Sequence, residues 1–279
     1  NRLLSIPFGC EMRVEVLTAD YLDIDLKAEG IVFPVMPAQP SVSKSDDPAS
    51  LPFIYDRAQY QRDEYYGLAP AEAQVEGTMR SLNLGLVSIS PFEYNPVQST
   101  MKICREMTVR VEFINPDWSL TQEIQDKFYS PFYEVVYDQI LNYQTPLDDA
   151  SKADLVKYPV KYLIISNRMY EAQLQPFIAW KIKKGFNVVV AYTDVIGATT
   201  TAIKSYIQSV YNAANPPEDP APSFVLLVGD VNQIPSYSGS AGSHITDLKY
   251  CEFTGDNYPE IYYGRFSAQT TGQLQPQID

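Results

Sequence analysis

Residues 162–166 read Tyr162-Leu163-Ile164-Ile165-Ser166, a continuous apolar run. A run of this kind is typical of a parallel strand that is buried on both faces of a sheet. Residues 171–184 follow with apolar side chains at helical spacing, and Gly185 then ends this segment as the C′ residue of a helix does. The stretch therefore predicts a buried strand followed by an amphipathic helix.

The same order repeats further along the chain. We predict strands at 187–192 and 224–228, with a helix at 200–213 between them. Alternating strands and helices specify a three-layer α/β domain with a mainly parallel sheet and right-handed connections. Catalytic groups and ligands of such sheets gather at the carboxyl ends of the strands, where Gly229-Asp230 follows the third predicted strand. No G-x-G-x-x-G follows the first strand and no P-loop motif occurs, so the sequence does not favour a nucleotide-binding enzyme.

The chain before residue 146 has a different pattern. Apolar residues alternate with polar ones at 12–16, 22–26 and 109–113, which is the period of antiparallel strands with one solvated face. We therefore predict an all-β sandwich or jelly-roll for this portion. Residues 119–142 then show apolar side chains at helix-like spacing, although Pro131 must break or start a helix.

Charge also divides the chain in two. The 279 residues include 21 basic and 34 acidic side chains, a net charge of −13, and residues 1–150 carry 23 of the acidic and 11 of the basic ones. We predict a first domain at 1–145, a polar linker at 146–158 and a second domain at 159–279. The acidic balance argues against nucleic acid as a partner, because phosphate backbones are repelled and no basic patch compensates.

The sequence predicts no transmembrane segment, since no stretch approaches the roughly 18 consecutive apolar residues that a membrane helix needs. Its first residues, Asn1-Arg2-Leu3-Leu4, lack an initiator Met and the build of a signal peptide. We expect either a removed export signal or a start inside a longer chain.

Cysteine and histidine are scarce. The three cysteines, at positions 10, 104 and 251, show no C-x-x-C spacing, and a single histidine, His244, excludes any site with several histidine ligands. His244 and Cys251 could form a thiolate–imidazolium dyad, and Ser243 and Asp247 lie close to His244 in sequence. A loop histidine and a half-buried cysteine is the simpler interpretation, because triads are recognised by geometry and not by sequence proximity.

Several segments of the second portion resemble the opening half of the catalytic domain of gingipain-type cysteine peptidases in order, spacing and residue type. They are Pro176-Phe177-Ile178-Ala179-Trp180-Lys181, Lys184-Gly185-Phe186-Asn187-Val188, Tyr192-Thr193-Asp194, Leu227-Val228-Gly229-Asp230, Thr246-Asp247-Leu248, and Gly255-Asp256 with Pro259-Glu260-Ile261-Tyr262 and Gly264-Arg265. The first portion resembles the pro-domain of such enzymes more loosely, at 87–96 and 129–143.

The resemblance implies a secreted or cell-surface endopeptidase zymogen of Bacteroidetes-like bacteria. A β-sandwich pro-domain would keep a caspase-like α/β catalytic domain latent. In the family, the nucleophilic Cys and its His partner lie in the second half of the catalytic domain, in His-Gly and Asn-Cys contexts that do not occur in this sequence. We therefore assign no catalytic residue to this chain and expect it to be inactive alone. Its partners would be the C-terminal remainder of the peptidase domain and, for the full-length enzyme, protein substrates.

Carboxylates suggest a metal site in the second portion. Asp230 at a predicted strand end, with Asp256 and Glu260 on a loop, would supply the hard oxygen ligands that calcium prefers. The resemblance adds the carbonyl of Tyr258 and implies a structural calcium ion, but the family carboxylate that aligns with Thr254 is missing, which should weaken the site. The alternative is that these acids are ordinary solvated loop charges, with Asp230 capping a turn.

Basic residues suggest two further roles. Lys152 and Lys157 lie in the predicted linker, near Lys161 and Arg168, and exposed polar linkers are where proteases cut, so we consider maturation by cleavage there. Three arginines, Arg57, Arg62 and Arg80, belong to the part of the acidic first portion that also holds Tyr55, Tyr60, Tyr65 and Tyr66. One of them could plug a specificity pocket of the enzyme, although surface stacking is the commoner role of such a cluster.

A function from another class stays open, because fold does not determine function. The chain could be a noncatalytic cell-surface binding or adhesion module that keeps a peptidase-like scaffold. A His-Gly and an Asn-Cys context downstream of Asp279 would favour the peptidase over this module.

Overall fold

The computed structural model describes residues 1–44, 46–146, 158–240 and 244–279. The chain forms two compact units. One comprises Asn1, Met12–Gln74 and Val87–Glu112, and the other comprises Arg2–Glu11, Val75–Leu86 and Phe113–Asp279. The predicted linker at 146–158 lies almost wholly outside the described residues, so the predicted domain boundaries stay a prediction.

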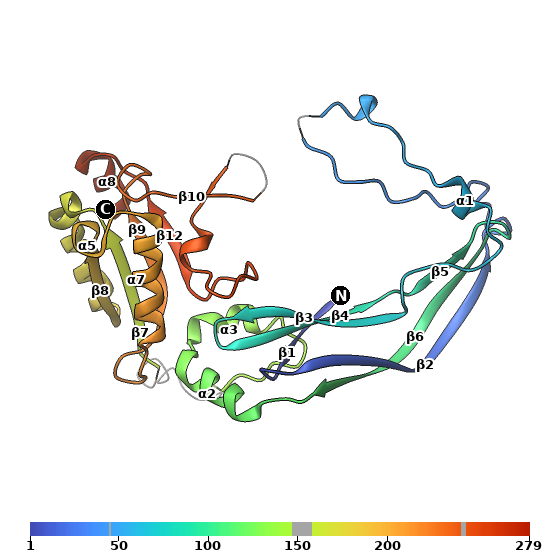
Figure 1. Cartoon of the computed structure of the whole chain (residues 1–279), viewed down its shortest axis with the longest axis horizontal. Coiled ribbons are helices and arrows are strands. Elements are labelled where there is room, and N and C mark those ends of the chain that lie inside the picture. Colours follow the sequence, from blue (N-terminus) through green and yellow to red (C-terminus); the bar gives the residue numbers. More distant parts are fainter. Residues whose placement is uncertain (45, 147–157, 241–243) are drawn as a thin grey trace. The chain divides into compact units, whose positions relative to one another are not determined.

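The second unit contains a four-stranded parallel sheet in the order β12-β9-β7-β8 (Figure 1). Its strands are β7 (Val160–Ser166), β8 (Phe186–Tyr192), β9 (Pro222–Val228) and β12 (Tyr262–Phe266). Strands β7, β8 and β9 contain the three strands predicted from the apolar runs. Their connections run through helices, as the predicted strand–helix alternation requires.

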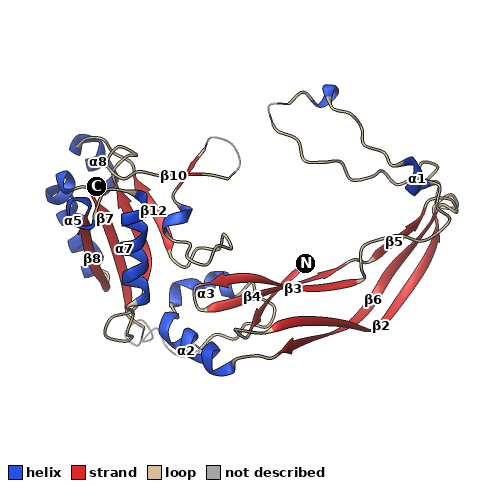
Figure 2. Ribbon diagram, in the orientation of Figure 1, coloured by secondary structure: helices blue, strands red, loops and turns tan. Residues whose placement is uncertain are grey.

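Helices cover both faces of this sheet (Figure 2). Alternate residues of a strand point to opposite faces, so Leu163 packs with Ile203 and Ile207 of α7 (Thr200–Asn212), whereas Ile164 packs with Leu174 of α5 (Glu171–Lys183). The second layer also includes α8 (Thr271–Ile278). The three-layer arrangement predicted from the sequence is confirmed for this part of the chain.

Strands of the earlier residues form two three-stranded sheets. One has the order β1-β4-β3, with β1 at Arg2–Ile6, β3 at Ala71–Met79 and β4 at Leu82–Ile89. The other has the order β2-β6-β5, with β2 at Glu11–Asp25, β5 at Phe92–Asn95 and β6 at Thr100–Ile114. Strands at the predicted positions are confirmed, and β5 and β6 pair antiparallel. A sandwich or jelly-roll made from these strands stays a prediction.

Residues 117–143 provide the helical segment that the spacing predicts. Asp117 caps α2 (Trp118–Phe128) by accepting from the Leu120 backbone N–H at 2.8 Å. Pro131 begins the short helix η2 (Pro131–Tyr133), which runs into α3 (Glu134–Tyr137). The proline therefore starts a helix, since its missing N–H costs nothing in a first turn.

A third buried cluster joins this helical segment to the β3–β4 hairpin. Its buried members are Leu82, Leu84, Tyr133, Tyr137 and Ile140. The partly buried Tyr258 and Tyr262 pack against it. Residues before the predicted linker thus share apolar core with residues after it, inside one compact unit.

The remaining elements are short. They are η1 (Pro48–Ser50), α1 (Arg57–Tyr60), η3 (Arg168–Tyr170), α6 (Thr193–Ile196), β10 (Tyr237–Ser238), β11 (Ile245–Thr246) and η4 (Leu248–Tyr250). Across the described residues, no helix has both the length and the apolar character that crossing a bilayer demands.

Candidate functional site

The carboxyl end of β9 leads into a turn at Gly229, whose φ of +135° suits glycine. The Asp230 side chain accepts hydrogen bonds from Gln269 Nε2 at 2.7 Å and from Ser267 Oγ at 3.1 Å. These hydrogen bonds, that from Gln269 foremost, lower the pKa of Asp230 because they favour the ionised carboxylate. Asp230 therefore ties the end of β9 to the segment that follows β12.

Arg265 of β12 organises the same edge of the sheet. Its guanidinium donates to both carboxylate oxygens of Asp247, at 2.7 and 2.8 Å, and to the carbonyls of Gly229 and Ile234 at 2.7 and 2.8 Å. The Arg265 and Asp247 side chains are only 13% and 16% exposed. The sequence placed Asp247 beside His244 as a triad candidate, but Asp247 is instead the partner of Arg265, a role that its position in the chain did not reveal.

Asp256 and Glu260 lie on a loop that precedes β12. Thr254 Oγ1 lies 2.8 Å from Asp256 Oδ2 and 3.1 Å from Glu260 Oε1, so one hydroxyl connects the two carboxyl groups. Burial raises the pKa of Glu260 to about 7, because an ionised carboxylate is poorly solvated there. When Glu260 is protonated, it can donate to Thr254 while Thr254 donates to Asp256.

Asp230 does not join these two acids. In the parallel register of β9 and β12, Tyr262 pairs with Phe224 and Phe266 pairs with Val228. Glu260 therefore precedes the amino end of this strand pair, whereas Asp230 follows its carboxyl end. About 13 Å of strand separates the two ends, at roughly 3.3 Å per residue. The predicted set of Asp230, Asp256, Tyr258 and Glu260 is not assembled as one site.

The remaining candidates for calcium already have hydrogen-bond partners. Asp256 Oδ1 accepts from the Tyr258 backbone N–H at 2.8 Å, and Glu260 Oε2 accepts from the Phe253 backbone N–H at 2.8 Å. Within the described residues, no group of three or more His, Cys, Asp or Glu side chains could hold a metal ion. Calcium bound by the loop that carries Asp256, Tyr258 and Glu260 stays a prediction.

Cys251 belongs to the core and has no exposed surface. Burial raises the pKa of its thiol far above the usual range, so the thiolate that catalysis needs is disfavoured. His244 is exposed, and its carbonyl accepts from the Gly239 N–H in the β10–β11 hairpin. Ser243 lies outside the described residues. These environments favour two residues with separate roles over a dyad, although Cys251 is fully buried and not half-buried as the simpler interpretation expects.

The three arginines differ in their surroundings. Arg62 forms an exposed ion pair with Glu64, and Arg57 begins the short helix α1. Arg80 is only 2% exposed, and it contacts Tyr133 and Tyr211, which are far from it in sequence. Among the cleavage candidates, Lys161 is buried in β7 and pairs with Asp219, whereas Lys152 and Lys157 lie outside the described residues.

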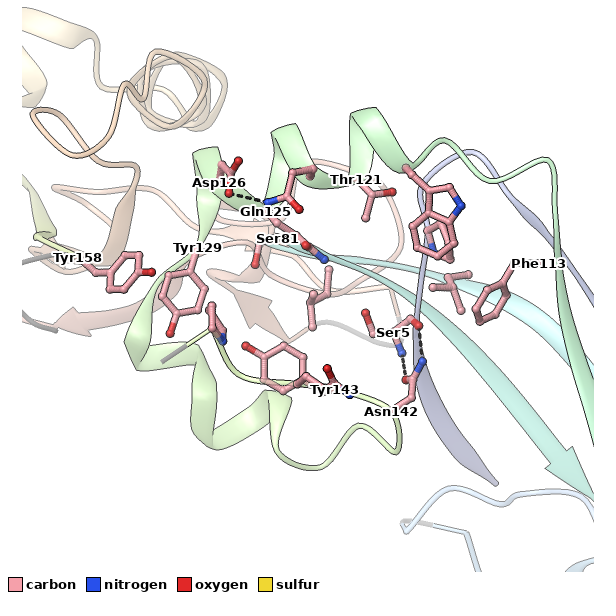
Figure 3. Close-up of a pocket in the computed structure, with 17 residues that line it drawn as sticks. Ser5, Ser81, Phe113, Thr121, Gln125, Asp126, Tyr129, Asn142, Tyr143 and Tyr158 are labelled. Atoms are coloured by element: carbon pink, nitrogen blue, oxygen red, sulfur yellow. Dashed lines mark hydrogen bonds between the residues drawn. The ribbon is translucent and has the colours of Figure 1, made fainter. Parts of the chain in front are cut away.

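A pocket of about 460 Å³ opens near α2 (Figure 3). Asn142 and Ser5 face each other at one side of it, with hydrogen bonds of 2.7 and 2.8 Å between them. Among the described lining residues, Asp126 is the one acidic side chain and none is a histidine, cysteine, lysine or arginine. The described lining therefore offers neither the thiol nor the imidazole of a cysteine–histidine pair.

Comparisons with known proteins give one consistent result. The sequence model of Propeptide_C25 matches residues 1–147, and that of Peptidase family C25 matches residues 156–279. Lys-gingipain of Porphyromonas gingivalis is 34% identical over the whole chain, and Gingipain R2 of that organism is 24% identical. The chain spans 16% of the length of Lys-gingipain and 36% of that of Gingipain R2.

Solved structures give partial matches. A structure concerned with the zymogenic latency of gingipain K from Porphyromonas gingivalis is 32% identical, with a TM-score of 0.38 over 40% of this chain and 61% of that chain. A complex of the pro- and mature domains of RgpB from that organism is 21% identical, with a TM-score of 0.40 over 51% of this chain and 69% of that chain.

Proposed function

This chain belongs to peptidase family C25, and on that premise we propose that it is the front part of a secreted or cell-surface cysteine endopeptidase zymogen. Residues 1–145 are the propeptide, 146–158 the linker that maturation cleaves, and 159–279 the first part of a caspase-like peptidase domain. The observation that carries this proposal is the succession of the two matches, propeptide and then peptidase, in a single chain.

The reacting groups come from outside this chain. In the proposed reaction a cysteine thiolate attacks the carbonyl carbon of a peptide bond, and a histidine protonates the departing amine. Water then releases the acyl group and restores the thiol. The buried state of Cys251 and the exposed position of His244 support this assignment, because neither residue has the surroundings that such a pair needs.

This chain contributes a scaffold to that site. Catalytic groups of parallel α/β sheets lie at the carboxyl ends of the strands, and Arg265 fixes the turn at Gly229 on that edge. β12 lies at one end of the strand order and offers backbone groups to a further strand. We assign this edge to the C-terminal remainder of the peptidase domain, which would extend the sheet.

The proposal is tested by identifying the reactive thiol of the full-length protein. The protein is cleaved in its linker and treated with a peptidyl chloromethyl ketone, and the alkylated cysteine is located by mass spectrometry. We expect label on a cysteine that follows Asp279 in the sequence. Label on Cys251 would contradict the assignment, and absence of any labelled cysteine together with absence of peptide cleavage would favour the noncatalytic binding module.

A further inference from the structure

Arg80 lies in the two-residue turn between β3 and β4, and its backbone has a φ of +54°. An arginine in the left-handed region is strained relative to its usual backbone conformations. Its side chain is nevertheless among the largest fully buried ones. A buried, permanently charged group in a strained turn requires strong compensating contacts.

Backbone carbonyls supply this compensation. Arg80 Nε donates to the Phe128 carbonyl at 2.5 Å, and Nη1 donates to the carbonyls of Pro222 and Glu260 at 2.8 and 3.1 Å. Nη2 donates to the Ala221 carbonyl at 3.2 Å. Phe128 lies in the propeptide match, whereas the other three acceptors lie in the peptidase match. The guanidinium therefore bridges the two parts of the chain.

The geometry is specific to arginine. The planar guanidinium has donors that point in fixed directions, whereas a lysine ammonium is a compact charge on a flexible stem. The guanidinium carbon also lies 5.2 Å from the ring centre of Tyr133 and 5.7 Å from that of Tyr211, within the range of cation–π attraction. Tyr133 belongs to the propeptide match and Tyr211 to the peptidase match. Lysine could keep the charge but not the full set of hydrogen bonds.

The strand that leads into this turn is fitted closely to the peptidase part. The Thr78 backbone N–H donates to Asp256 Oδ2 at 2.6 Å. A Cβ atom on Gly77 would lie 2.7 Å from the Cβ of Asp256, closer than real Cβ contacts allow. Gly77 has no positive φ, so its backbone conformation would allow alanine. It is the packing against Asp256 that excludes an alanine side chain there.

Two side-chain contacts extend the contact surface around Arg80. Ser130 Oγ and Ser223 Oγ form a buried hydrogen bond of 2.7 Å. Phe128 stacks on Tyr211 with ring centres 4.5 Å apart and planes within 2° of parallel. Each contact again joins a propeptide residue to a peptidase residue, and buried polar and aromatic pairs of this kind mark the centre of a tight interface.

We propose that Arg80 binds the propeptide to the peptidase part through its hydrogen bonds to the carbonyls of Ala221, Pro222 and Glu260. These contacts hold the two parts together after the linker is cut. This proposal rests on the proposed function, since it takes residues 1–145 as a propeptide that cleavage separates. It adds a specific recognition element: one arginine, at the amino ends of β9 and β12, determines how long the cleaved propeptide remains bound.

The test uses the full-length precursor with a site-specific protease sequence placed within residues 150–155. After cleavage, the bound fraction of propeptide is measured by size-exclusion chromatography over a dilution series. We expect Arg80→Ala to weaken binding by about 30-fold or more, which is the loss of roughly 2 kcal/mol that defines a dominant interface residue. Arg80→Lys should weaken it by at least about tenfold, because the charge remains while the forked hydrogen bonds are lost.

Arg110→Ala is the matched control, since Arg110 is an exposed propeptide arginine that pairs with Glu15. It should bind within about threefold of the unmodified protein. If the Arg80→Ala precursor is not recovered folded, the Gly77→Ala precursor is used in its place. Its added Cβ would clash with Asp256, so we expect weaker propeptide binding although Arg80 is unchanged. The proposal is overturned if folded Arg80→Lys and Gly77→Ala propeptides elute with the peptidase part as the control does. Binding is read without peptidase activity, so an inactive enzyme would count against the proposed function and leave this result standing.

Discussion

Arg80 Nη1 donates a hydrogen bond to the backbone carbonyl of Glu260 at 3.1 Å, although 180 residues separate the two along the chain. Arg80 belongs to the propeptide match and Glu260 to the peptidase match. The loop that ends at Glu260 leads directly into β12, the edge strand of the parallel sheet. A propeptide residue therefore helps to fix the conformation that this strand adopts at its start.

The Arg265–Asp247 ion pair should matter more for stability than the exposed ion pairs. We expect Asp247→Asn to lower the free energy of unfolding by about 3 kcal/mol, because Arg265 would keep its charge in a largely buried place without a carboxylate partner. Urea unfolding followed by circular dichroism measures this difference. Asp20→Asn, which removes the carboxylate of an exposed pair with Arg105, should cost no more than about 0.5 kcal/mol. Equal effects of the two substitutions would contradict the role of Asp247.

Cysteine reactivity separates the core thiol from a catalytic one. In the folded chain we expect iodoacetamide to label Cys104, which is partly exposed, and to leave Cys251 unlabelled until urea unfolds the protein. Burial both blocks access to Cys251 and raises the pKa of its thiol, so the reactive thiolate is scarce. Mass spectrometry of tryptic peptides over a time course gives the two rates. A Cys251 rate equal to that of Cys104 would show that the thiol is accessible.

Limited proteolysis should distinguish the candidate cleavage positions. We expect trypsin to cut first after Lys152 or Lys157, which lie in the polar linker sequence, and to spare Lys161. Lys161 is 2% exposed, and its strand pairs with neighbours on both sides, so the backbone cannot enter a protease cleft. Mass spectrometry of the early fragments identifies the cut. An early cut after Lys161 would be incompatible with β7 as described.

Strand and helix positions of the second portion could be predicted because local pattern fixes them. The apolar run at 162–166 and the helical spacing at 200–213 each report burial directly. Pro131 was predicted to break or start a helix, and it starts one. The sequence could not decide how the alternating strands of the first portion face each other, since a period of two fixes a strand and not its partner.

The candidate site was harder to predict, because register decides which strand ends meet. Asp230 and Glu260 both flank strands, yet they lie toward opposite ends of the β9–β12 pair. Arg265 lies in one of the segments that resemble gingipain-type peptidases, but nothing near it in the sequence indicated that its side chain would reach Asp247. Arg80 is one of the three arginines considered from the sequence, but its burial against the carbonyls of Ala221 and Pro222 could not be predicted, since every residue type carries a carbonyl.

Calcium binding on the 254–260 loop can be tested by its effect on melting. We expect millimolar calcium to raise the melting temperature over that in EGTA, and Glu260→Gln to remove this difference. Asp230→Asn should leave the difference unchanged, because Asp230 bonds to Ser267 and Gln269 away from the loop. Differential scanning fluorimetry measures each pair of conditions. A melting temperature that does not respond to calcium in the unmodified chain would show that the loop, with Thr254 between its acids, holds no such ion.

The proposed function, the restrained front part of a thiol peptidase, is tested by the onset of proteolysis in the full-length precursor. Hydrolysis of an unstructured protein substrate is followed for the full-length precursor before and after cleavage within residues 146–158 and removal of the propeptide. We predict hydrolysis that begins only after this treatment, that iodoacetamide abolishes, and that persists in Cys251→Ala. Hydrolysis that is absent after propeptide removal, or that iodoacetamide leaves intact, would rule out a thiol peptidase restrained by residues 1–145.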